Sequence, residues 1–131
     1  MKVLFLSEID DYMVKVNVKL NSSKKLFELG DYADSVSLSY YAMFLTAKAL
    51  LIKKGIYPKT HAGLISTFGK EYVREDDFNL SVYRYLARAQ TLRETADYEA
   101  VDNITADIAV EKINQAEEFI DEAKKFFYEK K

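Results

Sequence analysis

The chain has 131 residues, 49% of them hydrophobic and 31% charged, and a net charge of −2. This length fits a single domain, residues 1–131, with enough burial for a core. The chain contains no cysteine, which excludes disulfides, thiol nucleophiles and zinc–thiolate sites. No run approaches the roughly 18 apolar residues of a membrane span, and the apolar opening segment is too short for a secretory signal. We therefore expect a cytoplasmic protein that does not enter a membrane.

Charge is distributed unevenly along the chain. Residues 1–70 carry an excess of four positive charges, and residues 71–131 an excess of six negative ones. Four lysines gather around the end of one predicted helix: Lys48, Lys53, Lys54 and Lys59. They could dock an anionic ligand or partner, but cations are also favoured at helix C-termini without any ligand. Both interpretations stay open.

With only one proline and four glycines, the chain favours long helices. A strand-like alternation over residues 14–20 competes in the first segment, but a longer helical stripe and the stop at Gly30 favour a helix. The stripe consists of Ile9, Met13, Val16, Leu20 and Phe27.

The second predicted helix runs from about Asp31 to Lys54 and ends at Gly55. Its apolar face is broad, which is typical of the central helix of a bundle. Its stripe consists of Val36, Tyr40, Met43, Ala47 and Leu50. After a loop, Thr60 is a plausible N-cap for a shorter helix through Val73.

Two more helices complete the pattern, the last with Thr105 as its N-cap. The fourth has a stripe of Phe78, Val82, Leu86, Ala89, Leu92 and Ala96. The last has one of Ala109, Ile113, Ala116, Ile120, Ala123 and Phe127. The sequence therefore predicts an all-α fold, an antiparallel up-and-down bundle of four long helices and one short helix.

Several kinds of active site are excluded by the motifs. A di-iron bundle needs Glu-x-x-His pairs, but His61 is the only histidine and no glutamate precedes it by three residues. There is no glycine-rich phosphate loop and no Ser-His-Asp spacing. The sequence predicts no metal and no cofactor.

His61 is the first candidate for a functional residue. It shares the apolar face of the short helix and lies in its first turn, where a helix N-terminus disfavours the imidazolium. We expect a neutral ring, which serves as a base or ligand-recognition group, or else only anchors the preceding loop.

The stretch "TLRETADY" supplies the second group of candidates. Arg93 is expected on the flank of the fourth stripe, with Asp97 four residues on. An exposed pair of this kind contributes only about 0.3–0.5 kcal/mol. Alternatively, the planar guanidinium faces a phosphate or carboxylate. Tyr40 and Tyr41 lie mid-helix, where core packing is expected.

The run "GDYADSVSLSYYAMFLTAKALLIKKGIYPKTHAGL", followed by "LRETADY" and a long final helix, resembles the HEPN (higher eukaryotes and prokaryotes nucleotide-binding) family. The similarity is to its small single-domain archaeal and bacterial members and covers nearly the whole chain. It implies a helical bundle, usually a homodimer, often encoded beside a minimal nucleotidyltransferase in toxin–antitoxin pairs. In the toxin branch it implies a metal-independent endoribonuclease with an arginine, four to six residues, then a histidine.

This chain departs from the ribonuclease motif. Positions 98–100, where the histidine is due after Arg93, hold Tyr98, Glu99 and Ala100. The sequence therefore predicts no catalytic residue.

Three hypotheses remain. The first is a nucleotide-binding module or nucleotidyltransferase partner, with Arg93, His61 and Lys59 as an anion-recognising edge, Asp97 beside Arg93, and Tyr98 as a stacking or modifiable group. The second is an RNA-cleaving enzyme in which His61 and Arg93 meet in space. The third is a purely structural interaction protein.

Overall fold

The computed structural model of the chain describes residues 2–100 and 103–127. These residues form α1 (Lys2–Glu28), α2 (Tyr32–Lys53), α3 (His61–Phe68), a π-helical segment η1 (Gly69–Arg74), α4 (Leu80–Tyr98) and α5 (Ala106–Phe127). No strand occurs among them. The predicted all-α class is confirmed.

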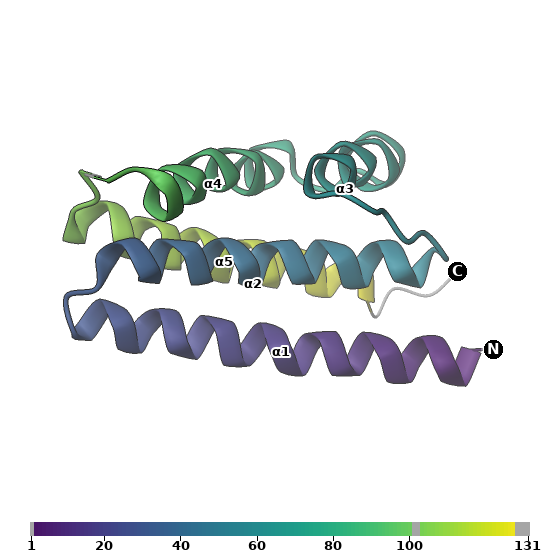
Figure 1. Cartoon of the computed structure of the whole chain (residues 1–131). Helices are drawn as coiled ribbons and strands as arrows, with labels where there is room; N and C mark the ends of the chain where they lie inside the picture. Colours follow the sequence, from purple (N-terminus) through teal and green to yellow (C-terminus); the bar gives the residue numbers. More distant parts are fainter. Residues whose placement is uncertain (1, 101–102, 128–131) are drawn as a thin grey trace.

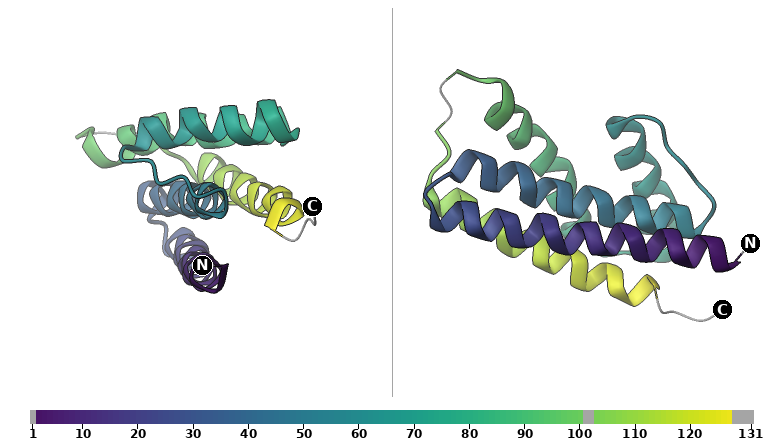
Figure 2. Two further views of the ribbon diagram at one scale, coloured as in Figure 1. Left: turned by 90° about the vertical axis from the view of Figure 1, so that its right-hand side faces the viewer. Right: turned by 60° about the horizontal axis from the view of Figure 1, so that its bottom comes forward.

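The helices are stacked in three layers, with α2 at the centre. Figures 1 and 2 show α1 on one side of α2, α5 beside α2, and α3 and α4 in a layer on the other side. By length and composition α2 could cross a membrane, but 78% of its most apolar window is buried in the molecule. Burial against its neighbours therefore accounts for its apolar character, as predicted for the central helix.

Two glycines end α1 and α2 in the left-handed conformation. Gly30 has φ +83° and Gly55 has φ +78°, values that side chains with a Cβ rarely adopt. Both had been predicted as helix stops. The turn at Gly30 is short, so α2 returns directly along α1 (Figure 1).

Side-chain caps begin three of the helices. Thr60 accepts a hydrogen bond from the Gly63 backbone N–H at 2.9 Å, and Thr105 accepts one from Ile108 at 3.3 Å. These two predicted caps are confirmed. Asn79 accepts from Val82 at 3.1 Å and caps α4, so Phe78 lies just before that helix and not within it.

The short third helix reaches about as far as predicted but changes its geometry. After Phe68 the chain continues as the π-helical η1. Gly69 lies against Tyr83, since a Cβ at this position would approach the Tyr83 hydroxyl to 2.8 Å. Over six residues, an apolar pattern cannot distinguish a π turn from an α turn.

The buried line of α4 differs from the predicted stripe. Arg93, expected on its flank, is itself buried with 8% exposure, whereas Leu92 and Ala96 are only partly buried. That expectation was wrong because Arg93 continues the helical spacing of the core residues and finds partners there. The residues buried along α4 are Val82, Leu86, Ala89 and Arg93.

Candidate functional site

His61 and Arg93, 32 positions apart in sequence, meet on the same tyrosine of α2. The Tyr40 hydroxyl lies 2.9 Å from His61 Nδ1, and the Arg93 guanidinium lies 5.3 Å from the centre of the Tyr40 ring. His61 comes from the first turn of α3 and Arg93 from the last turns of α4. We call Ser37, Tyr40, His61, Arg93 and Asp97 the Tyr40 cluster.

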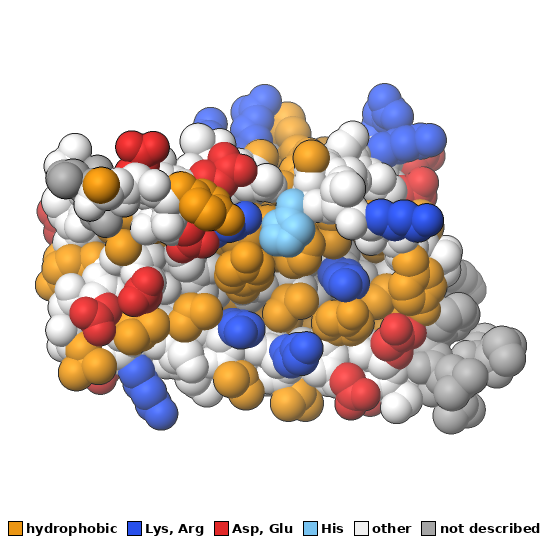
Figure 3. Space-filling view, viewed as in Figure 1, with side chains coloured by type: hydrophobic (Ala, Val, Ile, Leu, Met, Phe, Trp, Pro, Cys, Tyr) orange, Lys and Arg blue, Asp and Glu red, His pale blue; other side chains and the backbone are white. Residues whose placement is uncertain are grey.

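Aromatic rings of α2 hold the His61 imidazole in place. The Phe44 ring stacks on it with centres 4.1 Å apart, and the Tyr41 ring meets it edge-on at 6.0 Å. Figure 3 shows the histidine at the surface between α4 and α3, beside hydrophobic and cationic side chains. One side of the ring is therefore fixed by α2, and another side faces outward.

His61 is neutral near pH 7. Partial burial lowers the pKa of its imidazole, and the positive charges of Arg93 and Lys48 lower it further. The neutral ring expected from the sequence is therefore supported, and its cause includes two neighbouring cations.

Arg93 is held by a chain of polar contacts. Its Nη1 donates to Asp97 Oδ2 at 3.1 Å, and the Ser37 hydroxyl donates to Asp97 Oδ1 at 2.6 Å. Burial alone would lower the pKa of the guanidinium. The Asp97 hydrogen bond, Tyr41 and Tyr98 together raise that pKa above its usual value. The predicted Arg93–Asp97 pair is present, and it is more deeply buried than an ordinary surface pair.

One atom of Arg93 has no partner. Among the described residues, Nε of Arg93 is the single buried side-chain polar atom without a hydrogen bond. Buried donors in native proteins are almost always paired, so an unpaired one calls for an explanation. A ligand oxygen is one such explanation.

Tyr40 was expected only to pack in the core, and it does more. It is fully buried, and burial raises the pKa of its hydroxyl well above the ordinary range, although the charge of Arg93 acts in the opposite direction. The group is therefore a neutral phenol near pH 7. Sequence reasoning placed Tyr40 in the stripe of α2 but had no signal for its partner in α3.

Ser37 was missed altogether. It lies three residues before Tyr40 on α2, with 8% exposure. A polar residue within a broad apolar face was the available signal, because such residues need partners when they are buried.

Two of the predicted site residues are exposed. Tyr98, next to Asp97 in sequence, is 76% exposed but still acts on Arg93, whose pKa it helps to raise. Lys59 is exposed, and it makes no hydrogen bond or ion pair with the described residues.

The predicted lysine cluster also separates in space. Lys53 donates to the Phe126 backbone carbonyl at the end of α5, and Lys54 pairs with Asp76 at 2.9 Å. Lys48 is the lysine that influences His61, and its ammonium lies 5.2 Å from the centre of the Tyr12 ring. The partners of Lys53 and Lys54 are thus a helix end and a carboxylate. The lysine whose charge acts on His61 is Lys48, whereas Lys59 had been expected beside it.

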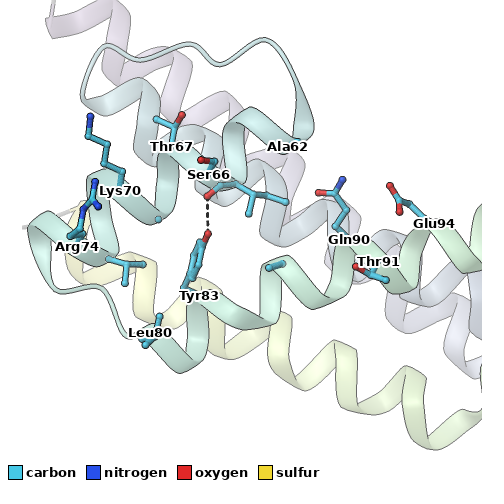
Figure 4. Close-up of a pocket in the computed structure, with 14 residues that line it drawn as sticks. Ala62, Ser66, Thr67, Lys70, Arg74, Leu80, Tyr83, Gln90, Thr91 and Glu94 are labelled. Carbon is cyan, nitrogen blue, oxygen red and sulfur yellow. Dashed lines mark hydrogen bonds between the residues drawn. The ribbon is translucent and has the colours of Figure 1, made fainter.

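An open groove of about 820 Å³ lies between α4 and the α3–η1 segment. Figure 4 shows Lys70 and Arg74 toward one end and Glu94 toward the other, with the Tyr83 hydroxyl donating to the Ile65 carbonyl across it. Neither His61 nor Arg93 lines this groove. We place the candidate site at the Tyr40 cluster, where the neutral imidazole and the unpaired Nε–H lie.

Among the described residues, no group of three or more His, Asp or Glu side chains could hold a metal ion. The groups of the Tyr40 cluster suit an anion instead: a guanidinium, a neutral imidazole and a phenol, with the Lys48 ammonium nearby.

Comparison with known proteins identifies the family. The HEPN domain profile matches residues 10–126, which is most of the chain. The chain belongs to the HEPN domain family.

Similar HEPN relatives occur in archaea. "Putative toxin MJ0142" of Methanocaldococcus jannaschii is 31% identical over 130 residues, covering 99% of this chain and 88% of the relative. "Putative toxin MJ0605" of the same organism is 42% identical over 106 residues, covering 81% of this chain and 78% of the relative. A "UPF0332 protein" of Archaeoglobus fulgidus is 35% identical over 121 residues, covering 91% and 94%. The chain thus spans most of the length of each, and two of them carry a toxin name.

Proposed function

We propose that this HEPN protein is a cytoplasmic nucleotide-binding module of a toxin-related system, and that the phosphate of the nucleotide binds at the Tyr40 cluster. The observation that carries the proposal is the Arg93 guanidinium, buried on Tyr40 close to His61 with its Nε unpaired. The toxin names of two relatives support the biological setting.

The chemistry around Arg93 suits a phosphate with an attached base. Hydrogen bonds from charged donors to phosphate oxygens are among the stronger ones in proteins, and a buried guanidinium is less screened than a surface one. Lys48 adds a second positive charge, near enough to act on His61. The partly buried Tyr41 ring offers an aromatic surface, and bases stack on such surfaces with little regard for sequence.

The partners of the protein belong to the same proposal. A homodimer and a minimal nucleotidyltransferase are the expected protein partners, and RNA is a further nucleotide-containing ligand. The helical spacing supports an antiparallel up-and-down bundle of four long helices and one short helix as the frame of the site. The protein partners follow from the resemblance to HEPN members of toxin–antitoxin pairs.

Thermal unfolding across a panel of nucleotides tests the proposal. A nucleotide at about 100 times its dissociation constant adds roughly 2.7 kcal/mol of stability, which raises Tm measurably. We expect the shift in the wild type, its loss in Arg93→Lys, which keeps the charge but lacks Nε and the planar fork, and its retention in Arg88→Ala. Arg88 is exposed on the same helix and makes a matched control. No shift with any nucleotide, or an unchanged shift in Arg93→Lys, would contradict a phosphate site at Arg93.

A second candidate function is a metal-independent endoribonuclease. It is favoured by one observation: His61 and Arg93 come together on Tyr40 although the linear motif is absent. Cleavage of RNA in the presence of a chelator should then disappear in both His61→Ala and Arg93→Ala. Cleavage that persists in either variant would exclude this candidate.

A further inference from the structure

We infer that the Tyr40 hydroxyl donates a hydrogen bond to Nδ1 of His61, so that His61 presents Nε2–H as a neutral hydrogen-bond donor to an acceptor oxygen of the bound ligand. Tyr40 is then a positioning residue, which sets both the tautomer and the direction of the ring. Its effect on the tautomer exists in the free protein, whereas the role of Nε2–H in recognition rests on the proposed function.

A hydrogen bond and ring stacking hold the Tyr40 and His61 side chains in one arrangement. The Tyr40 hydroxyl and His61 Nδ1 are 2.9 Å apart, an ordinary hydrogen-bond distance. Phe44 stacks on the imidazole with an interplanar angle of 25°, which fixes the plane of the ring. A half-turn about the Cβ–Cγ bond would put a carbon in place of Nδ1 and lose the hydrogen bond to Tyr40. His61 is also the first residue of α3, directly after the Thr60 cap. Its backbone is therefore fixed as well.

The direction of the hydrogen bond follows from the acceptors within reach. Tyr40 is fully buried, and among the described residues its hydroxyl has no hydrogen-bonding acceptor except His61 Nδ1. If Nδ1 carried the proton and donated to the phenol, the phenolic O–H would be buried without an acceptor. A buried unpaired donor is costly, whereas the reverse direction satisfies both groups.

Partial burial and the surrounding charges disfavour the third state, the imidazolium. Arg93 from α4 and Lys48 from α2 both act to lower the pKa of the His61 ring, in addition to its partial burial. The phenol in turn remains protonated because burial raises the pKa of Tyr40. A neutral ring bonded through Nδ1 carries its single proton on Nε2.

The remaining nitrogen is available to a ligand. Among the described residues, Nε2 of His61 has no hydrogen-bond partner, yet it is not a buried unpaired atom. It is therefore open to solvent. An Nε2–H can donate to a phosphate or carboxylate oxygen, but it cannot accept a proton. The same tautomer thus favours ligand binding over a general-base role for His61.

Nitrogen-15 NMR of the ligand-free protein tests the tautomer directly. His61 is the only histidine of the chain, so its ring signals need no assignment. We expect a protonated, pyrrole-type shift at Nε2 and a pyridine-type shift at Nδ1 near neutral pH. In Tyr40→Phe the two shifts should move toward each other as the tautomers mix. Tyr41→Phe is the matched control, because Tyr41 contacts the same ring without a hydrogen bond to it, and it should leave the shifts unchanged.

The tautomer assignment is overturned if Nδ1 is the protonated nitrogen, or if Tyr40→Phe leaves the shifts as in the wild type. Either result is independent of any ligand, so it is distinguishable from a failure of nucleotide binding.

The recognition role is tested with ATP and inorganic phosphate as probes. The amide nitrogen of glutamine can lie near the position of Nε2, and that of asparagine near Nδ1. We expect His61→Gln to retain most of the ATP affinity and His61→Asn to weaken it by about tenfold or more, as for a lost hydrogen bond to a charged oxygen. Equal affinities in the two variants, or no binding of either probe to the wild type, would overturn the role of Nε2–H and leave the NMR result standing.

Discussion

Arg93 is a charged side chain at a position where the core of α4 would otherwise carry an apolar one. Its burial is tolerated because the guanidinium lies over two rings, 5.3 Å from Tyr40 and 5.5 Å from Tyr41, and is bonded to Asp97. Each cation–π contact contributes about 0.5–2 kcal/mol, depending on how far it is removed from water. Ser37 then fixes the carboxylate that neutralises the charge.

The stability of the fold should depend on the Asp97 carboxylate that pairs with Arg93. Asp97→Ala leaves a buried guanidinium without its anion, so we expect a loss of about 1–3 kcal/mol in the free energy of unfolding. Denaturant unfolding measures it. The control is Asp121→Ala, which breaks the exposed pair with Lys124 and should cost no more than about 0.5 kcal/mol. Equal costs in the two variants would show that Arg93 does not depend on Asp97.

At the scale of helices, the contact between α1 and α2 is built around three fully buried serines. The Ser23 hydroxyl donates to the Ser35 carbonyl at 2.6 Å and lies 2.8 Å from the Ser39 hydroxyl. Ser35 in turn donates to the Ser23 carbonyl at 2.9 Å. Small side chains allow close approach of the two helices, and the hydrogen bonds satisfy the polar groups that this approach buries.

A double-mutant cycle should show that these serines act together. Ser23→Ala leaves the Ser39 hydroxyl without its partner, so we expect it to cost about 1–3 kcal/mol. Adding Ser39→Ala should then cost less than it does alone, with an interaction energy of about 0.5 kcal/mol or more. Ser22→Ala, a partly exposed neighbour, should change stability by no more than about 0.5 kcal/mol. Strict additivity would mean that the two hydroxyls do not depend on each other.

Features set by local chemistry were predictable at this scale. Gly30 and Gly55 end helices because of their backbone conformation, and Thr60 and Thr105 begin them through their own hydroxyls. The π turn after Phe68 was not predictable, because six residues of apolar pattern fit an α turn as well, and the contact of Gly69 with Tyr83 joins segments distant in sequence.

The candidate site was predictable only in part. His61 and Arg93 could be singled out as polar residues near apolar faces. Their meeting on Tyr40 depends on how α3 and α4 cross α2, which no spacing along the chain encodes. Sequence neighbours were an incomplete guide for the same reason: Lys59 lies two residues before His61 along the chain, yet the lysine whose charge acts on His61 is Lys48.

For the molecule as a whole, the neutral His61 links stability to pH. Its pKa is lowered in the folded state by partial burial, Arg93 and Lys48, whereas in the unfolded chain it returns to about 6.5. Between these two values the unfolded state binds more protons than the folded state, so stability rises with pH. The stability that comes from keeping His61 neutral is therefore lost as the pH falls from about 6.5 through the folded pKa. Below that value His61 causes no further change in the free energy of unfolding.

Comparison of the wild type with His61→Gln isolates this effect from the carboxylates, which titrate in both proteins. We expect the free energy of unfolding of the wild type to fall relative to the variant as the pH is lowered from about 7.5 to about 5.5, because only the wild type has an imidazole to protonate on unfolding. Urea unfolding at several pH values measures the difference. A constant difference across this range would mean that the imidazole titrates alike in both states. The two cations and the Tyr40 hydroxyl would then have no net effect on its protonation, and the neutral donor proposed for the site would lose its electrostatic basis.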